Sequence, residues 1–193
     1  MSLMLTLADT VAHVPQESLN LTAQYALVYA AAFCSIGFAA IGSAYGAGSA
    51  ACAAVGAWKK CYAQNRPAPF QLLIFAGAPL SQTIYGMIIM FIIMGAPLTQ
   101  YPVGVWYVYM AVGILSGVSM GVSALWQGIS AAAACDAFGE TGKGFTNQLM
   151  VLGIVETVAI FVMAFAIVLL NAIPAKIVEA GGAAVSAAAK AVQ

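Results

Sequence analysis

The chain has 193 residues, of which 63% are hydrophobic and only 6% are charged. Soluble domains carry about 25% charged residues, and the mean hydropathy of +0.98 is instead what a bilayer requires. Six basic and six acidic residues balance to a net charge of zero, so charge gives no indication of a nucleic-acid partner. The composition excludes an ordinary soluble domain and predicts a membrane protein.

The first stretch, residues 1–20, contains a short apolar run without a preceding basic region. A cleaved signal peptide normally begins with such a region. We therefore interpret these residues as an extracytoplasmic leader segment.

Four apolar blocks follow, and each is long enough to cross a bilayer, which takes about 20 helical residues. We predict an all-α membrane protein whose four transmembrane helices cover residues 21–58, 70–94, 103–135 and 145–170. Eleven of the twelve charged residues fall outside these blocks. Glu156 is the single exception.

The connectors between the blocks are short, so consecutive helices are expected to be antiparallel neighbours. They form a first helical hairpin, residues 21–95, and a second, residues 96–171. The remaining residues 172–193 are rich in alanine with a Gly-Gly break, and we expect either a frayed helix or disorder there.

Basic residues near the span ends predict the orientation. Lys59, Lys60 and Arg66 lie in the first connector and Lys143 lies in the third, whereas the middle connector has none. The positive-inside rule then places both hairpin turns in the cytoplasm. Both termini are expected outside, in a multi-pass protein of the cell membrane.

The two hairpins resemble each other. The segment "YGAGSAACAA" (45–54) matches "QGISAAAACD" (127–136), and aligning the second helices of each hairpin places Gln82 opposite Glu156. A duplicated helical hairpin explains both matches.

Small residues dominate the first and third helices, with pairs such as Gly42/Gly46 and Gly117/Gly121 one turn apart. Such pairs let helix backbones approach closely in lipid. Two interpretations remain open, namely tight packing within one protomer and the inner wall of a closed ring.

A few bulky polar groups interrupt the apolar spans, and polar groups in hydrocarbon usually mark an ion or substrate path. Ser81, Gln82 and Tyr85 share roughly one face of the second helix. The full set is Ser81, Gln82, Thr83, Tyr85, Gln127, Glu156 and Thr157.

Two chemistries fit a single membrane carboxylate. A lone carboxylate can carry a proton without further oxygens. A sodium ion needs several, which Glu156, Gln82, Gln127, Ser81 and a backbone carbonyl of the second helix could supply. The two glutamines favour sodium as a set, although each one singly could equally serve as a hydrogen-bonding contact between helices.

The motifs "IGSAYGAG", "APLSQTIYG", "WQGISAAA" and "VET", one on each helix, resemble the proteolipid (K or c) of V/A-type rotary ATPases over residues 25–172. In that family, four-helix protomers assemble into a rotor ring and a glutamate of the fourth helix carries the ion. The resemblance implies a subunit that is not an enzyme on its own.

The similarity is greatest to the sodium-translocating bacterial members, and it implies a site residue by residue. The ion-carrying glutamate falls on Glu156 and the two glutamines on Gln82 and Gln127. The hydroxyl ligand falls on Ser81, where the family usually has threonine, and the carbonyl ligand on Ala78. The tyrosine that locks the site falls on Tyr85.

The resemblance also implies partners. These are further copies of the chain in a homo-oligomeric ring, the central stalk of a soluble ATPase head, the lipid bilayer, and a stator subunit with an arginine. That arginine must come from another subunit, because the only arginine here is Arg66, in a connector. No cofactor is expected beyond the transported Na⁺ or H⁺.

Two alternatives come from other classes. A small proton-coupled exporter of cationic drugs would use one membrane glutamate with nearby aromatics, of which the fourth helix offers Phe161 and Phe165. That interpretation leaves the glutamine pair unexplained. A purely structural four-helix membrane protein would tolerate the loss of the Glu156 charge.

Overall fold

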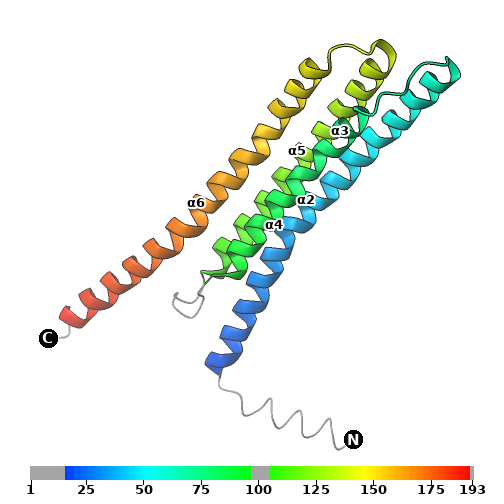
Figure 1. The fold of residues 1–193 in the computed structure, drawn as a ribbon. Coiled ribbons are helices and arrows are strands. Elements are labelled where there is room, and N and C mark those ends of the chain that lie inside the picture. Colours follow the sequence, from blue (N-terminus) through cyan, green and yellow to red (C-terminus); the bar gives the residue numbers. More distant parts are fainter. Residues whose placement is uncertain (1–15, 97–104, 192–193) are drawn as a thin grey trace, which may run out of the picture.

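The computed structural model describes residues 16–96 and 105–191, and the regular elements in these stretches are all helical (Figure 1). Most of the predicted leader and of the middle connector lies outside the described residues. The elements in chain order are α2 (Gln16–Ala63), α3 (Leu72–Gly77), the 3-10 helix η1 (Ala78–Leu80), α4 (Ser81–Met94), α5 (Trp106–Thr141) and α6 (Phe145–Ala191).

Four stretches of helix in the described part are long and apolar enough to cross a membrane. They are Leu21–Ala63, Leu72–Met94, Trp106–Thr141 and Phe145–Ala172. The prediction of an all-α protein with four apolar helices is thereby confirmed.

The second span is broken in its middle. Pro79 cannot donate a backbone hydrogen bond, and the chain passes through η1 between α3 and α4. The Ser81 backbone N–H therefore bonds to Ala78 O, in the 3-10 pattern. This break immediately precedes the polar residues of α4.

Two helices continue beyond the predicted ends of their spans. α2 extends past Trp58 and α5 past Cys135, so Lys60 and Glu140 lie on helices and not in connectors. The Lys60 ammonium lies 2.9 Å from a carboxylate oxygen of Asp136 and 2.9 Å from one of Glu140. Lysine and glutamate have high helix propensity, so a helix can continue beyond the apolar part of its span.

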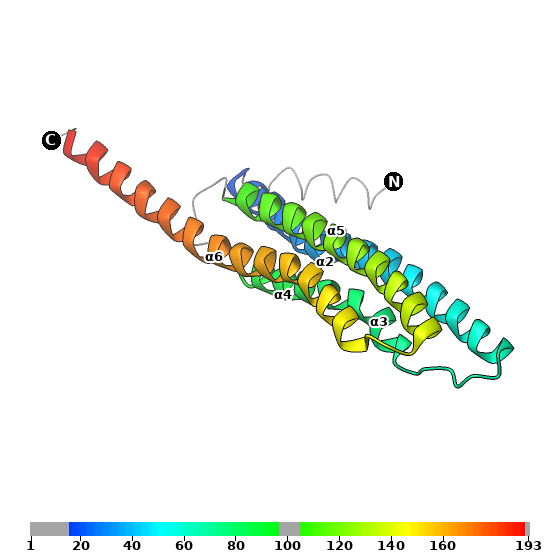
Figure 2. The same ribbon diagram turned by 90° about the horizontal axis from the view of Figure 1, so that it is seen from above.

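Helices α2 and α5 make the closest approach in the fold. A β-carbon on Gly42 would overlap the backbone of Gly121, and one on Gly128 would overlap the backbone of Gly46. The predicted role of small residues in close packing is confirmed within the protomer. Figures 1 and 2 show α4 alongside this pair and α6 at the flank.

α6 continues as a helix to Ala191, beyond the apolar stretch that ends at Ala172. Its C-terminal part stands apart from the other helices in both views (Figures 1 and 2). Lys176 and Glu179 on this extension are exposed. Of the two expectations for the tail, the described residues up to Ala191 have the helix, in keeping with the high helix propensity of alanine.

Candidate functional site

Glu156 lies on α6 and is half-buried where α6 faces α4 and α5. The hydroxyl of Tyr85 on α4 donates a hydrogen bond to Glu156 Oε1 at 2.7 Å. The amide nitrogen of Gln127 on α5 lies 3.4 Å from Glu156 Oε2. Both carboxylate oxygens are therefore held, each by a donor from a different helix.

Gln127 connects the carboxylate to the second glutamine. Gln82 Nε2 donates to Gln127 Oε1 at 2.7 Å, and Gln127 Nε2 also donates to the carbonyl of Leu152 at 3.1 Å. Both glutamine side chains are 0% exposed. Buried amides are costly unless they are hydrogen-bonded, and these two are joined by a hydrogen bond across α4 and α5.

Three oxygen atoms gather at the start of α4. The Ser81 hydroxyl lies 3.1 Å from the carbonyl oxygen of Ala78 and 3.2 Å from Gln82 Oε1. The 3-10 turn at Pro79 produces this cluster, because it brings Ser81 back over the Ala78 carbonyl. The side chain of Gln127 lies between this cluster and Glu156.

This polar layer is enclosed by apolar packing on both sides. Phe75, Ala131 and Leu152 belong to a buried cluster towards the α5–α6 turn. Ile89 and Ala159 belong to a second cluster on the opposite side. Gln82, Gln127 and Glu156 each lie in sequence between the residues that their span gives to the two clusters. The three helices therefore contribute to one polar layer at a common depth.

The structure thus brings together all six predicted site residues, namely Ala78, Ser81, Gln82, Tyr85, Gln127 and Glu156. Thr157, which was among the polar candidates, is exposed and its hydroxyl donates to Ile154 O at 2.6 Å. The sequence pattern did not point to the Leu152 carbonyl, because a backbone acceptor has no residue signature.

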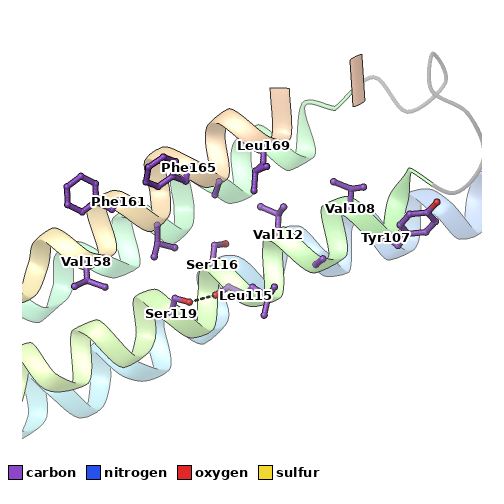
Figure 3. A pocket seen from close by; sticks show the side chains of 13 residues that line it. Tyr107, Val108, Val112, Leu115, Ser116, Ser119, Val158, Phe161, Phe165 and Leu169 are labelled. Atoms are coloured by element: carbon purple, nitrogen blue, oxygen red, sulfur yellow. Dashed lines mark hydrogen bonds between the residues drawn. The ribbon is translucent and has the colours of Figure 1, made fainter. Parts of the chain in front are cut away.

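An apolar groove of about 730 Å³ lies between α5 and α6, near the N-terminal end of α5 (Figure 3). Phe161 and Phe165 line it from α6. Its polar groups include Ser119, whose hydroxyl donates to Leu115 O at 2.7 Å. No charged residue lines the groove, and Glu156 is not part of it.

The described residues offer no other metal or disulfide site. They contain no group of three or more His, Cys, Asp or Glu side chains that could hold a metal ion. All four cysteines are free: Cys34, Cys52, Cys61 and Cys135.

The fold and this site define a multi-pass membrane protein with one polar layer around a single carboxylate. The model of the ATP synthase C-subunit family matches residues 110–169. A comparison with curated proteins gives no match. Over this stretch the chain is therefore similar to the C subunit of ATP synthase.

The matched segment covers most of α5 and much of α6. It includes Gln127 and Glu156 but not Ser81, Gln82 or Tyr85. The α4 side of the polar layer is therefore known from the geometry of this chain alone.

Proposed function

We propose that this protein is the ion-carrying rotor-ring subunit of a V/A-type ATPase and that it carries Na⁺ across the membrane. Each copy would take one ion at Glu156, and copies of the chain would form the ring. A soluble ATPase head, joined through a central stalk, would supply or take up the rotational work.

The observation that carries this proposal is a chain of hydrogen-bonded polar side chains that leads from one carboxylate to a cluster of three oxygens. Glu156 is connected through Gln127 to Gln82, and Gln82 to Ser81 and the Ala78 carbonyl. A purely structural scaffold gains little from a carboxylate inside the membrane, where charge is expensive. A bound cation would neutralise the carboxylate and so lower the cost of keeping it in the membrane.

The number of oxygens favours sodium over a proton. A proton needs one acceptor, whereas a hard cation stripped of water needs several oxygens. Gln127 Oε1 accepts one hydrogen bond from Gln82 and retains a second lone pair for an ion. Gln82 Oε1 and the Ser81 hydroxyl, which lie together at the start of α4, would supply two further oxygens.

Ion release requires a positive group from another subunit. Arg66, the only arginine in the sequence, hydrogen-bonds with the backbone carbonyls of Gly139 and Glu140 at the end of α5. It is therefore engaged at the hairpin turns, away from Glu156. A stator arginine would compete with the ion for the carboxylate as the ring turns.

The exporter alternative gains no support from the groove between α5 and α6. A cationic drug needs a carboxylate in its binding pocket, and the lining residues include none. Phe161 and Phe165 line that groove away from the polar layer.

The test is labelling of Glu156 by a hydrophobic carbodiimide in membranes that contain the whole complex. We expect Na⁺ to protect Glu156 from the reagent, with weaker protection at lower pH because protons compete for the carboxylate. K⁺ at the same ionic strength should not protect. Glu156→Gln should abolish labelling and ion transport, whereas the exposed Glu140→Gln should change neither.

Labelling of Glu156 without Na⁺ protection would overturn the sodium assignment and favour a proton ring. Full transport by Glu156→Gln would overturn the rotor-subunit proposal itself.

A further inference from the structure

Ser43, in the middle of α2, is 2% exposed, and its hydroxyl oxygen has no hydrogen-bond partner among the described residues. A buried, unpaired hydroxyl costs free energy. Ser35, two turns earlier on α2, is also buried, but its hydroxyl donates to the carbonyls of Ala32 and Gly86 at 2.7 and 3.0 Å. Ser43 therefore differs from a serine that only joins two helices.

The register of α2 against the broken second span shows which residue Ser43 faces. A β-carbon on Gly86 would lie 3.0 Å from Ala39 Cβ, and one on Gly46 would lie 3.1 Å from Pro79 Cβ. Since the two helices run antiparallel, the step from Ala39 to Ser43 corresponds to the step from Gly86 back to Gln82. Ser43 thus lies on the face of α2 directed at α4, at the depth of Gln82.

Gln82 has a donor that fits this hydroxyl. A carboxamide carries two N–H donors and one carbonyl oxygen. In the described residues, Gln82 Nε2 donates one hydrogen bond, to Gln127 Oε1, while Gln82 Oε1 accepts from Ser81. The second N–H of the fully buried Gln82 amide therefore has no acceptor among these bonds.

We propose that Ser43 is a positioning residue of the ion site and that its hydroxyl oxygen accepts the second N–H of Gln82. The structure itself has no hydrogen bond at the Ser43 hydroxyl, so the proposed bond requires the Ser43 side chain to turn towards Gln82. The contact would then fix the plane of the amide so that Gln82 Oε1 faces Ser81 and the ion. The unpaired donor and the unpaired acceptor, each buried at the same depth, satisfy each other.

This inference rests on the proposed function, because it assigns a part of the same sodium site. It adds α2 to the site, to which α4, α5 and α6 already contribute. The rotor helix that packs most closely against α5 would then take part in ion affinity as well as in packing.

A local alternative exists for the hydroxyl. A serine in a helix can donate to the carbonyl one turn back, here that of Ala39. In that case Ser43 would satisfy itself within α2 and would not influence Gln82. The two possibilities differ in their effect on sodium affinity.

The test compares Ser43→Ala, Ser43→Thr and Ser35→Ala in the assembled complex, measured as the Na⁺ concentration that half-protects Glu156 from carbodiimide. Loss of one hydrogen bond that orients a ligand should raise this concentration about threefold to tenfold in Ser43→Ala. Ser43→Thr retains the hydroxyl and should restore it towards the original value. Ser35→Ala removes a buried hydroxyl from the same helix face and should leave it unchanged.

Thermal unfolding separates this role from a general loss of stability. Ser35→Ala also removes a buried hydrogen bond, to Gly86 O, and should lower stability, but only Ser43→Ala should raise the half-protecting concentration. An unchanged half-protecting concentration in Ser43→Ala, with the original protein still protected by Na⁺, would overturn the inference alone. Absence of Na⁺ protection in the original protein would instead overturn the sodium site on which it rests.

Discussion

The Tyr85 hydroxyl and the Glu156 carboxylate are joined by a 2.7 Å hydrogen bond between α4 and α6. These residues are distant in sequence and belong to different hairpins. The bond closes the polar layer on the side of α6, where the neighbouring residue Thr157 is exposed. We therefore propose that Tyr85 controls access to the carboxylate.

Tyr85→Phe should accelerate the release of bound Na⁺. A hydrogen bond to a charged group contributes about 1.5–3 kcal/mol, so we expect at least a tenfold faster exchange, measured with radioactive sodium on the purified complex. Tyr45→Phe is the matched control, since Tyr45 is 70% exposed on α2. An unchanged release rate in Tyr85→Phe would show that Tyr85 does not retain the ion.

Gln127→Leu should lower both stability and sodium affinity. The change leaves Gln82 Nε2 and the Leu152 carbonyl without their bonds in a buried layer, which costs about 1–3 kcal/mol. Thermal unfolding in detergent measures the first effect and carbodiimide protection the second. The exposed Gln71→Leu should alter neither.

The double variant Gln82→Leu/Gln127→Leu should be less destabilised than the sum of the two single variants. Removing both partners of a buried hydrogen bond leaves fewer unpaired groups than removing one. Additive unfolding free energies would argue that the two amides do not depend on each other.

Gly128→Ala should destabilise the protomer by about 1–3 kcal/mol through overpacking. Its β-carbon would overlap the backbone of Gly46. Gly48→Ala is the matched control on α2, because its β-carbon meets nothing within 4 Å, and it should be neutral or stabilising by up to about 1 kcal/mol. Equal unfolding temperatures for the two variants would contradict the close α2–α5 contact.

Labelling of two lysine positions from opposite sides of the membrane would test the predicted orientation. Lys143 is exposed in the turn between α5 and α6, and Lys176 is exposed on the extension of α6. In a background free of other cysteines, Lys143→Cys should react with a membrane-impermeant maleimide only from the cytoplasmic side. Lys176→Cys should react only from the opposite side, and the reverse pattern would invert the topology.

The candidate site could be predicted from the sequence to an unusual extent. Glu156, Gln82 and Gln127 stand out because bulky polar residues are rare in apolar spans, and rarity alone identifies them. The close packing of the small-residue helices could be predicted for a similar reason, since repeated small residues on one helix face are a packing signal. The structure then showed that Gly42 meets Gly121.

Other features could not be predicted from residue types. The helices continue through Lys60 and Glu140, whose charges pair across α2 and α5. Hydropathy cannot predict either feature, because it ends a span where charges begin and carries no information on pairing between distant segments. The tail beyond Ala172 is helical to Ala191, whereas its composition left a frayed helix and disorder open as alternatives. Ser43 gave no signal, because serine is common in small-residue helices.

The sequence by itself determined the class of protein, the number of apolar helices and the polar residues within them, because hydropathy and polarity are properties of each residue type. Only the tertiary structure decided which atoms meet. It gave Glu156 donors from two helices, set the orientation of the Gln82 and Gln127 amides, and placed Ser43 at their depth. These contacts depend on the register between helices, which glycine contacts and the break at Pro79 fix in three dimensions.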